Sequence, residues 1–207
     1  AEKYVRKIFA KKDPLLMVSD PLDLLREPVP CLSIKTKKDG IIPLVLNKAQ
    51  LHIMRIFKSL WDAGKPIRII MLKARQVGST TFFMAILYSI VSQSEGESAS
   101  IIADEKGKAN DVFDMAKLFQ ERCPPYLRPE TKKSNERKLE FADTKSQIVI
   151  DTAENKDAGR SSTLRYVLMT EYAFYRKANA DALLLGISHS MPSAPRTIRI
   201  KESSANG

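Results

Sequence analysis

Short apolar strands alternate with helical segments over most of this 207-residue chain, and this alternation constrains the fold more than any other feature of the sequence. The first clear strand, 67–72, is followed by a turn that contains a glycine and by an apolar helix over 80–92. Further strands are predicted at 100–103, 139–141, 147–150, 166–169 and 197–200, and further helices at 111–120 and 178–190. Strands that alternate with helices favour an α/β fold with a mainly parallel sheet covered on both faces.

Another helix precedes this alternation. Asn47 is predicted to cap it, and apolar residues recur at helical spacing from Ile53 to Trp61 until Gly64 ends the pattern. Residues 1–40 read instead as an extension outside the core, because prolines recur there too often for a long helix and the segment closes in a turn signal. We therefore expect an N-terminal extension over 1–40 and a core domain over 41–207.

Composition argues against several classes of protein. No apolar run approaches the ~20 residues that span a bilayer, and no secretory signal is recognised at the start of the sequence. The two cysteines and two histidines stand alone, without metal-ligand spacing, which argues against a zinc enzyme or a Cys-His hydrolase. A net charge of +10, from 34 Lys and Arg against 24 Asp and Glu, raises nucleic acid as a partner. A solvated surface explains the basic clusters over 3–12 and 132–138 equally well.

The stretch KARQVGSTT, 73–81, lies between the first strand and its helix. A phosphate-binding loop needs this setting: a strand end, a tight turn and a helix N-terminus aimed at the anion. Measured against GxxxxGK[ST], Gly78 matches the second glycine and Thr80 the hydroxyl. Lys73 occupies the first glycine position and Ser79 the usual lysine position, so the strict motif fails. A lysine at the front of the loop can still reach the β- and γ-phosphates, with Thr80 as a Mg²⁺ ligand. A structural turn with a chance glycine is the alternative interpretation.

Five motifs then follow one another from about residue 45 to the end of the chain. They are LNKAQ with Gln50, the Arg75-Gln76-Val77-Gly78 core with Lys73 before it and hydroxyls after it, AGRSST around Arg160, YVLMTEYAFY with its acid at Glu171, and the closing ESSANG over 202–207. In this order they resemble the large terminase subunit of tailed bacteriophages, the ATP-driven motor that packages DNA into the capsid. Some members of that family carry the variant loop with its lysine at the front.

The resemblance implies a P-loop NTPase fold of the ASCE type, with ATP and Mg²⁺ as cofactors. Glu171 would orient or deprotonate the attacking water. Arg75 would stabilise transition-state charge within the subunit, and Arg160 would be the arginine finger of a neighbouring subunit. Nucleotide contacts are implied for Gln50 (with adenine), Lys73, Arg75, Gln76, Gly78, Ser79, Thr80 and Thr81, metal contacts for Thr80 and Thr170, and coupling of hydrolysis to motion for Ser203, Ser204 and Asn206.

One departure from the family pattern concerns the acidic strand. In the family, four apolar residues are followed by Asp-Glu, and here Thr170 replaces the aspartate. Asp104 with Glu105, and Asp151, match the bare pattern better. Glu171 is preferred because the acidic strand in this class comes late in the chain and is expected to lie beside the phosphate-loop strand. Asp151 stays open as a metal ligand.

The resemblance implies the ATPase domain of a viral DNA-packaging motor that translocates double-stranded DNA into the procapsid. Implied partners are double-stranded DNA, a portal protein and a small terminase subunit, with a homo-oligomeric ring on the portal, no membrane, and a location in the host cytoplasm rather than the mature virion. The family's C-terminal nuclease domain is expected outside these residues. Two alternatives stay open: a helicase-like, nucleic-acid-stimulated ATPase, and a basic nucleic-acid-binding module without catalysis.

Overall fold

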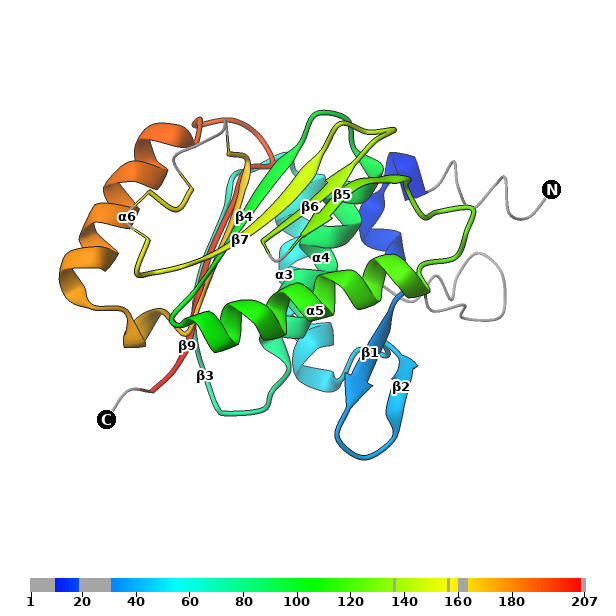
Figure 1. Ribbon diagram of the computed structural model, residues 1–207, viewed down its shortest axis with the longest axis horizontal. Helices are drawn as coiled ribbons and strands as arrows, with labels where there is room; N and C mark the ends of the chain where they lie inside the picture. Colours follow the sequence, from blue (N-terminus) through cyan, green and yellow to red (C-terminus); the bar gives the residue numbers. More distant parts are fainter. Residues whose placement is uncertain (1–9, 19–30, 136, 156, 160–163, 206–207) are drawn as a thin grey trace.

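Figure 1 shows the computed structural model, which describes residues 10–18, 31–135, 137–155, 157–159 and 164–205. A seven-stranded sheet with the order β3-β9-β8-β4-β7-β6-β5 forms the centre of these residues. The strands are β3 (Ile67–Lys73), β4 (Ser98–Ala103), β5 (Thr131–Asn135), β6 (Lys138–Phe141), β7 (Gln147–Thr152), β8 (Tyr166–Thr170) and β9 (Ile198–Ser204). Neighbours from β3 to β7 in this order are parallel, and β6 and β5 extend the sheet in antiparallel pairing.

Helices pack against both faces of this sheet (Figure 1). One core joins the sheet to α3 (Lys48–Asp62), α4 (Ser79–Gln93) and α5 (Lys106–Arg122), and a second core joins it to α6 (Lys177–Ser190). Successive strand residues point to opposite faces, so Ile101 belongs to the first core and Ile102 to the second. Two 3-10 helices, η1 (Pro14–Met17) and η2 (Tyr172–Phe174), and a hairpin of β1 (Ser33–Thr36) and β2 (Gly40–Pro43) complete the described elements.

This architecture confirms the predicted α/β class with a mainly parallel sheet flanked by helices. Every predicted strand and helix is present, with bounds that differ by a few residues. Strands β1, β2 and β5 were not predicted from the sequence. The sequence of β5, TKKSN, is polar throughout, so it carries no alternating apolar pattern. Its strand conformation comes from backbone pairing with β6 at the edge of the sheet.

Helix α4 is buried on all sides and anchors the loop that precedes it. Every residue from Phe82 to Gln93 is buried, because the helix packs between the sheet, α5 and η1. A helix that is apolar all round is expected in such a position. Its N-terminus therefore has a fixed place at the carboxyl end of β3.

Part of the segment expected as an extension contributes to the core. Leu15, Met17, Val18 and Leu32 are buried and join the same core as α4. The expectation that residues 1–40 stand outside the core is therefore wrong for these side chains, because an apolar face of η1 covers one side of α4. The domain boundary at residue 40 itself stays a prediction.

Candidate active site at the carboxyl edge of the sheet

The carboxyl ends of the parallel strands meet at one edge of the sheet, where open α/β folds bind their ligands. Lys73 ends β3, Ser204 ends β9 and Thr170 ends β8. The acidic strand β8 was expected to lie beside β3, the strand before the predicted phosphate loop. This expectation is wrong, because β9 lies between β3 and β8. Adjacent strands are only ~4.8 Å apart, so long side chains from β3 and from the end of β8 still meet across β9.

The loop between β3 and α4 has the geometry of an anion-binding turn. Gly78 is the N-cap of α4, with φ of +77°, and its position supplies no side-chain cap. Gln76 in the same loop also has a positive φ, of 64°. The first N–H groups of a helix have no partner within the helix. At this terminus they point out of the helix end, an arrangement that suits an anion.

The start of helix α3 is hydrogen-bonded to this loop. Asn47 and Gln50 form a reciprocal capping box at the start of α3. In addition, Gln50 Nε2 donates to the carbonyl of Gly78 at 2.8 Å, and Asn47 Nδ2 donates to the carbonyl of Val77 at 3.1 Å. Gln50 is thus buried with both ends of its amide bonded to the chain. The predicted cap at Asn47 is confirmed, its bond to the loop was not foreseen, and the adenine contact of Gln50 stays a prediction.

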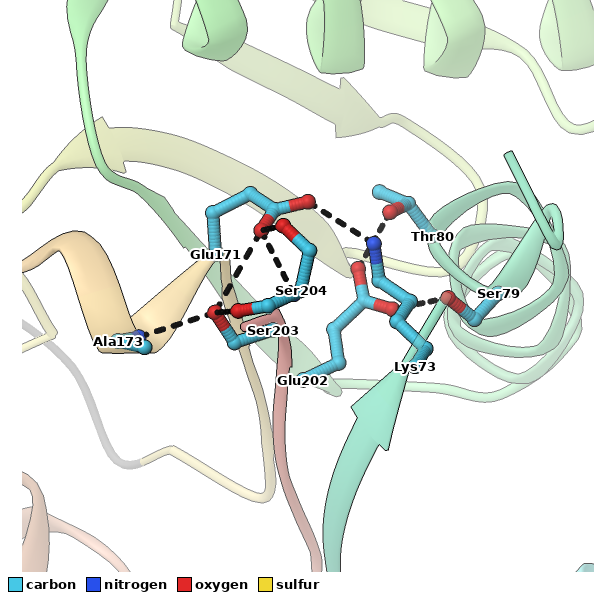
Figure 2. A network of polar contacts seen from close by, with 8 residues as sticks. All are labelled: Lys73, Ser79, Thr80, Glu171, Ala173, Glu202, Ser203 and Ser204. Atoms are coloured by element: carbon cyan, nitrogen blue, oxygen red, sulfur yellow. Dashed lines mark hydrogen bonds and ion pairs between the residues drawn. The ribbon is translucent and has the colours of Figure 1, made fainter. Parts of the chain in front are cut away.

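Lys73 and Glu171 form an ion pair in front of the loop (Figure 2). Lys73 Nζ lies 2.9 Å from Glu171 Oε1, and the two side chains are 7% and 23% exposed. Glu171 Oε2 accepts hydrogen bonds from the backbone N of Ser204 at 3.0 Å and from its Oγ at 2.9 Å. Glu171 itself has φ of 51°, a left-handed conformation that is uncommon outside glycine and concentrates at functional sites.

These contacts set the charge state of Glu171. Burial opposes its ionisation, but the ammonium of Lys73 and the two hydrogen bonds from Ser204 outweigh that effect and lower its pKa to about 2. Hydrogen bonds to the charged form of a carboxylate favour that form. Glu171 is therefore ionised at neutral pH and, while Lys73 contacts it, is a weak base.

A second carboxylate lies under the N-terminus of α4. Glu202 is fully buried. Its Oε2 accepts a hydrogen bond from the hydroxyl of Ser79, and its Oε1 accepts one from the hydroxyl of Thr80 (Figure 2). Burial raises the pKa of Glu202, although the two hydroxyls and Lys73 oppose the rise. No role was predicted for Glu202 from the sequence. The sequence does carry a signal for such a role: Glu202 places a charged residue at the next alternate position after Ile198 and Ile200, on the buried face of β9.

The other predicted residues that the structure describes lie at the ends of β8 and β9, in the loop after β3 and in α4. Thr170 is buried at the end of β8, and Ser203 Oγ accepts from the backbone N of Ala173 at 3.1 Å. Arg75 and Gln76 are exposed in the loop, and Thr81 is half-buried in the first turn of α4. Arg160 and Asn206 lie outside the described residues.

The rival acids occupy different surroundings. Glu105 is exposed at the start of α5. Asp151 accepts from the backbone N of Thr152 at 2.8 Å and from Asn155 Nδ2 at 2.5 Å, in a cluster of its own. Asp104 directly follows β4, its Oδ1 is buried and has no hydrogen-bond partner in the described structure, and burial raises its pKa. Of the four candidate acids, Glu171 is the one whose carboxylate contacts Lys73 in the described part of the chain.

The donor set fits a magnesium nucleotide. Mg²⁺ prefers hard oxygen ligands and takes only one or two protein groups when phosphates and water complete its shell. Hydroxyl and carboxylate oxygens meet here beside an amine and a helix N-terminus, which suit phosphate. Within the described residues, no group of three or more His, Cys, Asp and Glu is arranged to hold a metal ion by itself.

The basic surface of the sheet edge is partly neutralised. In the cluster over 132–138, Lys132 and Lys138 both pair with Glu140, at 2.8 and 2.9 Å. Exposed ion pairs of this kind contribute little to stability, but they reduce the positive charge available to a polyanion.

None of the helices in the described ranges combines the length and apolarity needed to cross a bilayer.

Comparisons with known proteins identify the fold. No family model matches the chain, and no curated protein matches its sequence. The fold resembles the large terminase ATPase domain of Thermus phage P74-26, with a TM-score of 0.55 and 17% identity over 78% of this chain and 66% of that one. It also resembles the large terminase of bacteriophage HK97, with a TM-score of 0.66 and 16% identity over 93% of this chain and 37% of that one. The chain thus spans less than two thirds of either protein, and the resemblance predicted from the motifs is confirmed in the fold.

Proposed function

We propose that this protein is the ATPase domain of a viral DNA-packaging motor, which couples Mg²⁺-dependent ATP hydrolysis to the translocation of double-stranded DNA into a procapsid. The observation that carries the proposal is the meeting of Lys73 and Glu171 in front of the hydroxyl-bearing N-terminus of α4. The similarity in fold to two phage large terminases supports the packaging role.

Binding of the triphosphate is assigned to the loop and the first turn of α4. The first-turn N–H groups and the amine of Lys73 hold the phosphates, as they do in other P-loop sites. Thr80 and Thr170 are the residues that would hold Mg²⁺ through their hydroxyl groups. Mg²⁺, when bound, would neutralise part of the charge of the phosphates. Gln50 and Gln76 flank the nucleotide, and Thr81 borders the phosphates.

Hydrolysis then follows from the ion pair. When Lys73 leaves Glu171 for the phosphates, Glu171 loses a cationic partner and its pKa rises from about 2 toward the ordinary range. It becomes a better base at the moment the substrate arrives. Glu171 takes a proton from the water that attacks the γ-phosphorus, and the bond to the bridging oxygen of ADP breaks. Arg75, and Arg160 of a neighbouring subunit, supply positive charge to the transferring group.

Coupling to motion is assigned to the end of β9. Ser204 bonds to Glu171 by its backbone N and its hydroxyl, and Ser203 links β9 to η2. A change at Glu171 during hydrolysis therefore reaches β9 and η2 together, and Asn206 continues the same segment. The surrounding assembly is proposed as a homo-oligomeric ring on a portal protein, with a small terminase subunit and double-stranded DNA, in the host cytoplasm.

Phosphate release by the purified chain tests the proposal. We expect Mg²⁺-dependent ATP hydrolysis that double-stranded DNA stimulates, and hydrolysis near background in Lys73→Ala. A matched control is Lys117→Ala, a half-buried lysine on α5 whose amine pairs with Asp114 and lies over the ring of Phe113. Equal turnover in the wild-type protein and Lys73→Ala contradicts the proposed chemistry. DNA binding without any nucleotide binding favours the non-catalytic module, and strand separation without a portal favours the helicase-like ATPase.

A further inference from the structure

Glu202 lies on β9, beside the position on the acidic strand β8 where Thr170 replaces the family's aspartate. In the parallel pairing of β8 and β9, Thr170 and Glu202 are register partners. Residues in register on parallel strands point to the same face of the sheet. Thr170 and Glu202 therefore both face α4, and Glu202 lies one strand closer to the phosphate loop.

The contacts of Glu202 are those that a metal-binding site of this fold needs. In P-loop NTPases, Mg²⁺ is held by the loop hydroxyl together with a strand-end aspartate. Here the strand-end position holds neutral Thr170. The hydroxyls of Ser79 and Thr80 instead donate to the two oxygens of Glu202, which leaves the hydroxyl oxygens as acceptors for a cation.

The burial of Glu202 points to a cation as its missing partner. A buried carboxylate is costly unless a cation or several donors compensate for the lost water. Among the described residues no lysine or arginine forms an ion pair with Glu202, because the amine of Lys73 pairs with Glu171. The hydrogen-bond partners of Glu202 are two neutral hydroxyls. The other residues on the same buried face of β9, Ile198 and Ile200, are apolar.

We propose that Glu202 is the carboxylate of the magnesium site, where it positions the hydroxyls of Ser79 and Thr80 and supplies the negative charge that Thr170 lacks. The inference rests on the proposed function and deepens it. Glu202 acts on the metal through the hydroxyls of α4, so it is a positioning residue. Glu171 remains the residue that acts on the water, and the two carboxylates have separate tasks.

Calorimetry with a non-hydrolysable ATP analogue, in Mg²⁺ and in EDTA, tests this role without measuring turnover. We expect Mg²⁺ to strengthen binding to the wild-type protein. In Glu202→Gln that gain falls by about 10–100-fold, the usual cost of losing a residue that orients a metal ligand. Affinity in EDTA stays within about twofold, since the helix N-terminus and Lys73 still bind phosphate. Glu171→Gln is the matched comparison, and it keeps the Mg²⁺ gain.

Rescue by Thr170→Asp separates this role from a structural one. In the double variant Thr170→Asp/Glu202→Gln, the carboxylate returns at the register partner, and we expect most of the Mg²⁺ gain to return. This double variant carries the test if Glu202→Gln alone does not fold. An unchanged Mg²⁺ gain in folded Glu202→Gln, or a folded double variant without any gain, overturns the inference. Absence of analogue binding by the wild-type protein, in Mg²⁺ and in EDTA, instead overturns the proposed function.

Discussion

The two carboxylates of the site belong to regions with opposite physical character. Glu171 follows β8 at the outer side of the site, partly exposed, with a cation and Ser204 as partners. Glu202 lies within β9 under α4, fully buried, with two neutral hydroxyls as partners. The pKa of Glu171 is lowered to about 2, whereas that of Glu202 is raised.

This difference indicates how one site divides two tasks between two identical side chains. Environments that push the pKa values of neighbouring acids apart usually mark different chemical roles. The outer region can change its partners when a substrate arrives, because its cation is on a flexible lysine. The inner region has no such freedom, because β9 and buried α4 fix it. We therefore assign the reacting water to the outer region and the metal to the inner one.

Removal of the outer carboxylate is expected to have the largest effect. Glu171→Gln keeps the size of the side chain but cannot accept the proton of the water. General acid–base catalysis contributes about 10²–10⁴-fold to such rates, so ATP turnover should fall by that factor while nucleotide affinity persists. Phosphate release and calorimetry measure the two. Glu121→Gln, on the exposed side of α5, is the matched control. Turnover within threefold of wild type would remove the outer region from the chemistry.

A side chain at Gly78 is expected to disturb the inner region and the stability of the fold. Gly78 has φ of +77°, and an added Cβ would lie 2.9 Å from Gln50 Nε2. The left-handed conformation alone costs an alanine about 1–2 kcal/mol. Displacement of the Gln50 amide adds to that cost. Urea unfolding of Gly78→Ala should therefore show a loss larger than this range.

Gly64→Ala provides the matched control for that measurement. Gly64 has a similar φ of +65°, but nothing lies within 4 Å of its added Cβ. Its free energy of unfolding should fall by the conformational cost alone, about 1–2 kcal/mol. Equal losses at Gly64 and Gly78 would show that the contact between α3 and the phosphate loop contributes nothing to stability.

The smallest expected effect is a pH dependence specific to the outer region. Because folding lowers the pKa of Glu171 from 4.5 to about 2, its ionised form stabilises the protein above about pH 4.5. That contribution is lost as the pH falls toward 2. With screening of a partly exposed pair, it amounts to roughly 1 kcal/mol. Denaturant unfolding of wild type and Glu171→Gln at several pH values measures it. A stability difference that grows as the pH falls would contradict the ion pair.

Much of the site was readable from the sequence because its parts are local. The strand, the turn and the helix from 67 to 92 are contiguous, so their order predicts an anion-binding loop without knowledge of the rest of the fold. The cap at Asn47 is equally local, since its partner Gln50 is three residues away. Glu171 was selected over Asp104 for a reason that the structure corrects in part, because β9 separates β8 from β3.

The sequence by itself determined the order of elements, the class of sheet and the position of the turn between β3 and α4, because periodicity and turn chemistry act between residues close along the chain. Only the tertiary structure decided which strand lies between β3 and β8, and hence that Glu202 reaches Ser79 and Thr80 while Lys73 reaches Glu171. Strand order and register depend on pairings between segments more than 100 residues apart, such as β3 with β9. A strand's own residues do not specify such pairings, since the backbone groups that make them are common to all residues.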